Sequence, residues 1–139
     1  MKRFFSPLAM YPDEIVGIVR IVLGALLIFH GIEIFDPETM NGYLQWDMFK
    51  KPSGKLLVYA GKTSEFIAGI LFFFGILTRL SAFVVICTFS YVTFFVGKGR
   101  FWYEDQHPFM FLLFGILFLF IGPGKWSLDN VIFKRPKDQ

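Results

Sequence analysis

Residues 15–29 read IVGIVRIVLGALLIF, an apolar run with a single charged residue, Arg20, inside it. Such a run is apolar enough to be the core of a membrane-spanning helix, which needs about 20 residues. A second run, at about residues 56–77, carries Glu65 near its centre. An ionisable side chain inside a bilayer costs about 2.5–3.5 kcal/mol on insertion scales, so it usually faces the interior of a helix bundle. The two runs therefore predict an integral membrane protein with a buried polar site.

The composition of the 139 residues supports this class. The chain is 55% hydrophobic and its mean hydropathy is +0.55, which is too apolar for an ordinary soluble domain. Runs that suit membrane spans lie at about residues 15–35, 56–77, 79–97 and 107–123. We therefore predict an all-α fold, a membrane four-helix bundle that forms one domain over residues 1–139.

The distribution of lysine and arginine predicts the orientation of the chain. The amino terminus, the second loop and the carboxyl terminus carry Lys2, Arg3, Arg79, Lys125, Lys134, Arg135 and Lys137. The first and third loops carry Lys50, Lys51, Lys55, Lys98 and Arg100. This excess favours both termini in the cytoplasm and a multi-pass protein of the cytoplasmic (inner) membrane. The net charge of +3 comes mostly from these flanks, so we expect no nucleic-acid partner.

Small residues recur at seven-residue intervals in the first two spans. They are Gly17, Gly24 and Gly31 in the first span, and Gly61, Ala68 and Gly75 in the second. Small residues let helix backbones approach closely in lipid, so we expect these two helices to pack along the two stripes. Arg20 and Glu65 lie beside the stripes, and we predict an ion pair between them inside the bundle.

Polar residues gather on the outer side of this predicted contact. A rise of 1.5 Å per residue places Glu65 near the membrane centre, Arg20 roughly 8 Å to the cytoplasmic side, and His30 and Lys62 roughly 6–8 Å to the outer side. The candidate ligand-binding or proton-relay residues are Arg20, His30, Glu33, Lys62, Glu65 and His107. Three plainer interpretations stay open: a purely structural Arg20–Glu65 pair, a Lys62 that reaches the headgroups, and a solvated Glu33.

The sequence also limits the chemistry of the protein. Cys87 is the sole cysteine, which excludes a CxxC redox pair and a cysteine-ligated metal cluster. Two histidines are too few to predict haem or a metal ion, so we expect no metal. The pattern assigns no catalytic residue and argues against an autonomous enzyme. Proton relay through His30, Glu65 and Glu33 is chemically feasible.

Two segments outside the spans carry further expectations. The first loop, residues 36–54, holds Trp46 and Phe49; it lies at the interface, caps the bundle, or is an ordinary connector with an aromatic anchor. Gly122-Pro123-Gly124 ends the last span and turns the chain, which brings Asp129 towards the tight turn at Arg79. Asp129 and Arg79 are then structural polar residues. Asp129 either pairs with Arg79 or caps a short helix that begins at Ser127 or at Asp129 itself.

These residues together resemble the DoxX family of four-helix membrane proteins. The resemblance rests on Arg20, His30-Gly31, Glu65 followed by Gly69 and Gly75, Leu77-Thr78-Arg79, and the string from Gly122 to Asp129. The last of these, Gly-Pro-Gly-x-x-Ser-Leu-Asp, is the most specific. Many relatives have a lysine soon after the His-Gly pair, where this chain has Glu33 and Ile34.

The resemblance implies a four-helix bundle and a link to quinone-dependent thiosulfate oxidation, to membrane redox complexes or to membrane-protein assembly. We therefore expect a subunit that binds a quinone or another apolar ligand, or that anchors a redox complex in the membrane. The alternatives are a non-enzymatic helper in membrane-protein assembly or stability and an oligomeric structural protein. The expected partners are membrane lipid and other membrane or redox proteins, and a homo-oligomer is compatible with the sequence.

Overall fold

The computed structural model describes residues 11–133, and every regular element in that range is a helix. The order is α1 (Pro12–Gly31), η1 (Ile32–Phe35), α2 (Pro37–Leu44), η2 (Asp47–Phe49), α3 (Gly54–Phe74), α4 (Thr78–Tyr91), η3 (Val92–Val96), α5 (Gln106–Ile121) and α6 (Asp129–Ile132). The prediction of an all-α membrane protein is confirmed. Lys2, Arg3, Lys134, Arg135 and Lys137, which entered the prediction of orientation, lie outside the described residues.

Three of the predicted spans correspond to helices long and apolar enough to cross a membrane: Pro12–Phe35, Gly54–Phe74 and Thr78–Val96. The last of these joins α4 to η3, a π-helical segment. The fourth predicted span is α5, an apolar helix of 16 residues, shorter than the other three.

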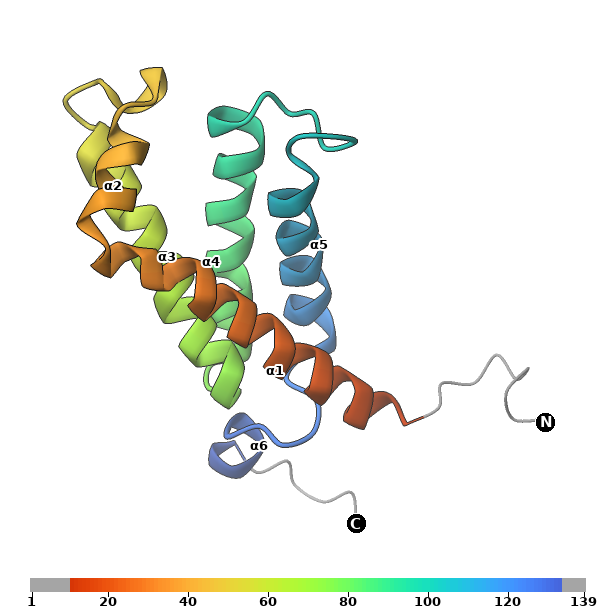
Figure 1. The fold of residues 1–139 in the computed structure, drawn as a ribbon. Coiled ribbons are helices and arrows are strands. Elements are labelled where there is room, and N and C mark those ends of the chain that lie inside the picture. The colour runs from red at the N-terminus through yellow and green to blue at the C-terminus, as the bar shows by residue number, and fades with distance from the viewer. Residues whose placement is uncertain (1–10, 134–139) are drawn as a thin grey trace, which may run out of the picture.

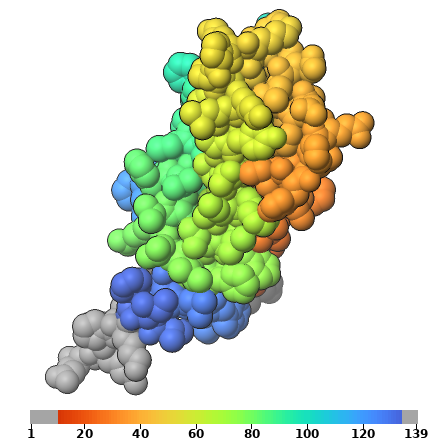
Figure 2. Space-filling model, turned by 90° about the vertical axis from the view of Figure 1, so that its left-hand side faces the viewer, coloured from red at the N-terminus to blue at the C-terminus, as the bar shows by residue number. Residues whose placement is uncertain are grey.

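The helices pack so that α3, α4 and α5 run side by side, while α1 crosses them at an angle (Figure 1). A continuous apolar core joins them, and Phe72 of α3 meets Phe118 of α5 edge-on at its centre, with ring centroids 5.3 Å apart. The segment after α5 folds under the end of α3, where it covers the lower part of the face shown in Figure 2.

Glycine determines how closely α1 and α3 approach. A Cβ atom built on Gly24 would lie 2.9 Å from the Gly69 carbonyl oxygen, and one on Gly69 would lie 2.6 Å from the Ile28 nitrogen. The predicted glycine stripe of α1 is confirmed in part, because Gly24 and Gly31 lie against α3 while Gly17 lies against the Lys125 backbone after α5. The predicted stripe of α3 is wrong in part, because Gly69 makes the contact while Gly61 faces open space. Gly75 instead ends α3 in the left-handed conformation (φ 65°), which glycine adopts without a steric penalty.

The first loop folds into a cap over one end of the helices. Pro37 begins α2, and the Asp36 carboxylate accepts hydrogen bonds from the backbone nitrogens of Glu38 (3.2 Å) and Thr39 (3.4 Å). Met40 of α2, Phe49 of η2 and Val58 of α3 form a small second core. Of the interpretations of this loop, the structure favours the cap.

Candidate functional site

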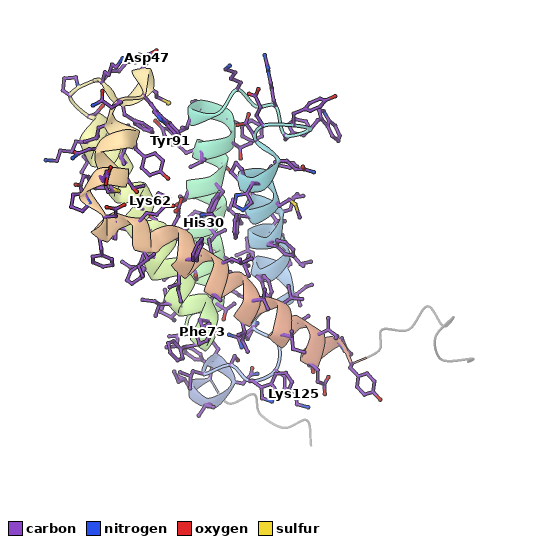
Figure 3. The ribbon with its side chains drawn as sticks, in the orientation of Figure 1. His30, Asp47, Lys62, Phe73, Tyr91 and Lys125 are labelled. Atoms are coloured by element: carbon purple, nitrogen blue, oxygen red, sulfur yellow. The ribbon has the colours of Figure 1, made fainter. Side chains whose placement is uncertain are left out.

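A chain of charged and polar side chains links α1, α2 and α3 near the capped end of the molecule. The Lys62 ammonium lies 2.9 Å from Glu33 Oε2 and 3.0 Å from Glu65 Oε2. The Tyr43 hydroxyl donates to the same Glu33 oxygen at 2.7 Å. Lys62 also donates to the His30 carbonyl oxygen at 3.3 Å. One ammonium therefore holds two carboxylates, and Figure 3 shows Lys62 beside His30 at this level.

Local sequence explains this arrangement. Lys62 and Glu65 are three residues apart on α3, so they share one face of the helix. On α1, Gly31 lies against α3 so closely that an added Cβ would be 2.7 Å from Phe66 Cβ. This approach brings the end of α1 to Lys62, and the 3₁₀ turn of η1 then places Glu33 on the same ammonium.

The two histidines bring α5 into the site. The rings of His30 and His107 meet edge-on with centroids 4.9 Å apart, and both also meet the Phe111 ring edge-on. In each neutral imidazole, one ring nitrogen donates a hydrogen bond and the other accepts one. His30 and His107, which are 77 residues apart in the sequence, are thus a pair in the fold.

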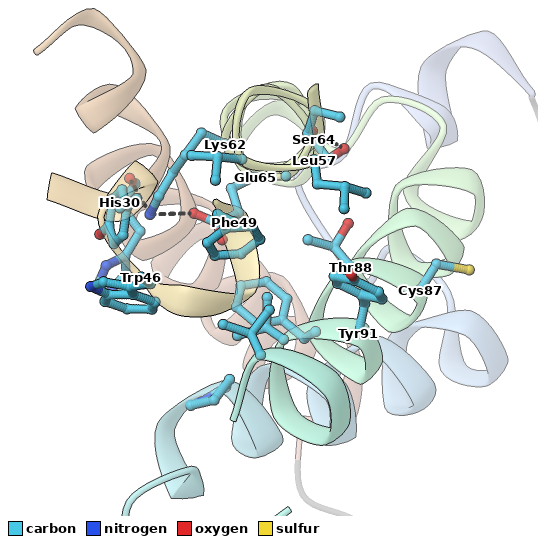
Figure 4. Close-up of a pocket in the computed structure, with 18 of the residues that line it drawn as sticks. His30, Trp46, Phe49, Leu57, Lys62, Ser64, Glu65, Cys87, Thr88 and Tyr91 are labelled. Carbon is cyan, nitrogen blue, oxygen red and sulfur yellow. Dashed lines mark hydrogen bonds and ion pairs between the residues drawn. The ribbon is translucent and has the colours of Figure 1, made fainter. Parts of the chain in front are cut away.

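These residues line one end of a cavity of about 440 Å³. The size falls within the range of roughly 300–1,000 Å³ that is typical of small-molecule sites. The polar lining residues at this end are His30, Lys62, Glu65 and His107. The apolar lining residues include Phe49, Val58, Phe89, Val92 and Val96 (Figure 4). A ligand with an apolar body and a polar head would find both kinds of surface here.

The burial of the charged residues shows which of them face the cavity. The side chain of Glu65 is 8% exposed and that of Lys62 is 14% exposed, whereas that of Glu33 is 31% exposed. The Lys62 ammonium is therefore held by two carboxylates inside the protein, and the interpretation that Lys62 reaches the headgroups is wrong. Glu33 is partly exposed, accepts a hydrogen bond from Tyr43 and forms an ion pair with Lys62. Through Lys62, Glu33 at the surface is connected with the buried Glu65.

Tyr43 is a site residue that was not predicted from the sequence. Burial, and then the hydrogen bond to Glu33, raise the pKa of its hydroxyl above the ordinary value. Its ring also lies 5.1 Å from the Lys62 ammonium, in cation–π geometry. Trp46 and Phe49 of the same loop line the cavity beside it. The signal that could have indicated Tyr43 is the group of aromatic residues in the first loop, which follows the polar end of the first span.

Arg20 belongs to a different site, and its predicted pairing with Glu65 was wrong. Its side chain is fully buried and binds carbonyl oxygens at the far end of α3. The guanidinium donates to the oxygens of Phe72 (2.5 Å), Phe73 (3.0 Å), Pro123 (2.8 Å), Lys125 (3.3 Å) and Trp126 (2.9 Å). The last carbonyls of a helix lack partners within the helix and carry partial negative charge, so they attract a cation. Glu65 pairs with Lys62 instead.

Asp129 is a helix cap. Its carboxylate accepts from the backbone nitrogens of Leu77 (2.7 Å) and Thr78 (2.9 Å), at the start of α4. The tail thus returns to the α3–α4 turn, as predicted. Asp129 does act as a cap, but it caps α4, whereas we predicted that it would cap a short helix of the tail. The short helix α6 does form, and the Ser127 hydroxyl accepts from the Asn130 nitrogen (3.2 Å) at its start. Arg79 lies exposed on this turn.

Asp105 holds a loop together and does not join the cavity. Its Oδ2 accepts from the backbone nitrogens of Lys98 (2.9 Å) and Arg100 (2.8 Å). Of the sequence-predicted residues, the structure brings His30, Glu33, Lys62, Glu65 and His107 together and leaves Arg20, Arg79 and Asp129 at the opposite end.

The fold and these two polar sites define an all-helical membrane protein with an amphipathic cavity. The family model for DoxX matches residues 15–98, and the chain belongs to the DoxX family. It is 27% identical to an uncharacterized protein of Haemophilus influenzae over 137 residues, 92% of this chain and 98% of that protein. It is 24% identical to an uncharacterized membrane protein of Mycobacterium tuberculosis over 131 residues, 84% of this chain and 80% of the relative. No solved structure matches the chain.

Proposed function

We propose that this protein binds a lipid-soluble quinone, or a ligand of similar shape, in the cavity at Lys62 and Glu65. The observation that carries the proposal is the lining of this one cavity by an ammonium, a carboxylate and two imidazoles at one end and by apolar side chains elsewhere. A quinone ring has an apolar face and two carbonyl oxygens. Lys62 and the histidines offer donors to such oxygens, and the apolar walls offer a dry surface to the ring.

The same residues suit a proton path to the ligand. Glu65 faces the cavity, Lys62 links it to Glu33, and Glu33 is the more exposed of the two carboxylates. Proton carriers inside membranes are commonly chains of Asp, Glu and His residues. Since Cys87 is the sole cysteine, electrons for a bound quinone would come from a partner protein. The protein would then act as the membrane subunit of a redox complex rather than as an enzyme by itself.

The proposal places the protein in the cytoplasmic (inner) membrane as one four-span domain. The fourth span would be α5, and both termini would face the cytoplasm. Its support is the charge distribution of the loops together with the contact between the two ends of the helical region, where the Lys125 ammonium lies 2.7 Å from Glu14 Oε1.

The test is equilibrium binding of decylubiquinone to the detergent-solubilised protein, followed by quenching of tryptophan fluorescence. Trp46 lines the cavity, so occupancy should quench it, and Trp46→Phe should remove most of the signal. We expect Lys62→Met and Glu65→Gln to weaken binding by about tenfold, which corresponds to about 1.4 kcal/mol. Lys55→Met is the matched control, because Lys55 is an exposed lysine on the same helix outside the cavity lining.

A helper in membrane-protein assembly is the second candidate. It is favoured by the α4–α5 loop, where Trp102 is 77% exposed and Tyr103 is 84% exposed, as in a surface that docks a partner. Mass spectrometry of gently solubilised protein separates the two candidates. Quinone in the extract supports the first; membrane proteins that copurify without a cofactor, and lose their association with Trp102→Ala, support the second and overturn the first.

A further inference from the structure

The cavity has a second end, which opens sideways between α3 and α4. The residues that line it there are Leu57, Ala60 and Ser64 on α3 and Cys87, Thr88 and Tyr91 on α4. Leu57, Ala60 and Cys87 are exposed at the surface of the molecule. Figure 4 shows this end of the cavity on the opposite side from Lys62 and His30, with the Cys87 sulfur directed outward.

This opening extends from the middle of both helices towards their capped end. Ser64 is the central residue of α3 (Gly54–Phe74), and Cys87 is the central residue of the continuous helix Thr78–Val96. With a rise of 1.5 Å per residue, each lies roughly 15 Å from either end of its helix. When these helices span a bilayer, the part of the opening at Ser64 and Cys87 faces the hydrocarbon core and not the headgroups.

The residues around the opening leave it wide and apolar. Ala60, Gly61 and Ser64 on one side are small, and a Cβ built on Gly61 would meet nothing within 4 Å. The Ser64 hydroxyl donates to the Ala60 carbonyl oxygen at 2.7 Å, so it presents no unpaired donor to the lipid. The opening is therefore compatible with a hydrocarbon chain, and the polar groups that remain at its α4 side are the hydroxyls of Thr88 and Tyr91.

The cap covers part of the route from the aqueous side. Phe49 of η2 (8% exposed) and Val58 of α3 (6%) line that end of the cavity and pack with Met40 of α2 (1%). Trp46 (50%) and His107, which also line the cavity, are exposed. The polar head site and the lateral opening are on the same helix, because Ser64 is next to Glu65 and Gly61 is next to Lys62 in α3.

We propose that the ligand enters the cavity from the hydrocarbon core of the bilayer between α3 and α4 and leaves its hydrocarbon chain in this opening. Its head lies at Lys62 and Glu65, and its single linear chain passes Ala60 and Cys87 into the lipid. The substrate class is then a membrane-dissolved amphiphile with one long chain. This inference rests on the proposed function, which supplies the head site.

The test compares two probes with the same head, decylubiquinone and the tail-less ubiquinone-0, on protein in lipid nanodiscs. The readout is quenching of Trp46 fluorescence, with each affinity expressed relative to the free concentration of probe in water. Wild-type protein should bind the decyl probe at least about tenfold more tightly than the tail-less one, because burial of even two methylenes supplies that ratio. Ala60→Phe and, independently, Cys87→Phe fill the opening, and each should reduce the ratio to about one to three.

Ile67→Phe is the matched control, since Ile67 is exposed on α3 but does not line the cavity. Ile67→Phe should retain the wild-type ratio. The probe partitions into the nanodisc lipid equally for all variants, so partitioning cannot change the ratio between them. If Ala60→Phe and Cys87→Phe keep the wild-type ratio, the chain does not lie in the opening and the inference fails. If neither probe quenches Trp46 in wild-type protein, the proposed function itself fails, so the two failures are distinguishable.

Discussion

At the scale of single residues, the most informative side chain is Arg20, a buried cation that binds backbone oxygens. Its five hydrogen bonds join the end of α3 to the segment after α5. Hydrogen bonds that involve a charged group contribute about 1.5–3 kcal/mol each. Arg20 thus fastens three parts of the chain that are distant in sequence.

Arg20→Lys should lower the free energy of unfolding by about 2–4 kcal/mol, because lysine has three donors and lacks the planar fork of arginine. Thermal unfolding in detergent measures the loss. Arg79→Lys, at an exposed position, should change stability by less than about 0.5 kcal/mol. An unchanged melting temperature in Arg20→Lys would contradict this role. Recovery on adding Glu65→Gln would favour the ion pair that we first predicted.

Tyr43 gives the site a pH dependence with a defined sign. Its pKa is raised in the folded protein by burial and by the bond to Glu33, so the folded state keeps the proton more tightly than the unfolded chain. The stability that this contributes is fully present below the ordinary tyrosine value of 10.0 and is lost as the pH rises through the higher folded value. We therefore expect Tyr43→Phe to show a smaller fall in melting temperature above that pH than the wild type. Equal falls in both proteins would contradict the assignment; Tyr59→Phe is the control.

At the scale of elements, the contact between α1 and α3 decides which charged residues meet. Gly24 lies against Phe73 and Gly31 lies against Phe66, so the two helices are antiparallel. A step of seven residues along α1 corresponds to a step of seven residues in the reverse direction along α3. Glu65 then faces the region of Glu33, and Arg20 faces the end of α3. This register explains why the predicted pair of Arg20 and Glu65 does not form.

Gly24→Ala should be strongly destabilising for this reason. The added Cβ would lie 2.7 Å from the Phe73 Cα and 2.9 Å from the Gly69 oxygen, both of which are backbone atoms that cannot turn away. Overpacking of this kind costs about 1–3 kcal/mol. Gly61→Ala is the paired control and should stabilise by up to about 1 kcal/mol, because its Cβ meets open space and alanine has the higher helix propensity. Similar melting temperatures for the two variants would show that the helices are not in close contact at Gly24.

The Asp129 cap makes a second prediction at this scale. Asp129→Ala should cost about 1–2 kcal/mol by freeing the first nitrogens of α4. Since the carboxylate binds backbone, the exchange of charges in Asp129→Arg with Arg79→Asp should be as harmful as the sum of the two single changes. Restoration of the melting temperature by the double exchange would instead reveal an ion pair with Arg79.

At the scale of the whole molecule, the sequence was sufficient for the helices and insufficient for their contacts. Hydropathy predicted the three long spans, and the three-residue spacing of Lys62 and Glu65 predicted that these two side chains share one face of their helix. It could not reveal the partners of Arg20, because these are backbone oxygens and leave no side-chain pattern. Nor could it single out Tyr43, since α2 is short and weakly apolar and reaches the site only through the fold of the first loop.

The same scale determines how often the chain crosses the membrane. The Lys125 nitrogen donates to the Asp13 carbonyl oxygen at 2.8 Å, so the start of α1 and the segment after α5 lie at one end of the molecule. Figure 1 shows α6 at that end and the α4–α5 loop at the other. The start of α1 and the segment after α5 can lie on one side of a membrane only if the number of crossings between them is even. With three long candidate spans, an even number requires one more crossing, and α5 is the remaining apolar helix among the described residues.

We therefore predict that α5 crosses the membrane, although its 16 residues cover only about 24 Å of a hydrocarbon core that is roughly 30 Å thick. Trp102 and Trp126, 77% and 59% exposed, flank it in the sequence, and tryptophans at such positions anchor a span at its two interfaces. Reporter fusions at the carboxyl terminus and after Gly99 measure the outcome. A cytoplasmic signal from the first and an external signal from the second are expected from the excess of positive charge on the terminal side. Two signals on the same side would contradict the crossing, whereas opposite signals in the reverse sense would retain the crossing and invert the orientation.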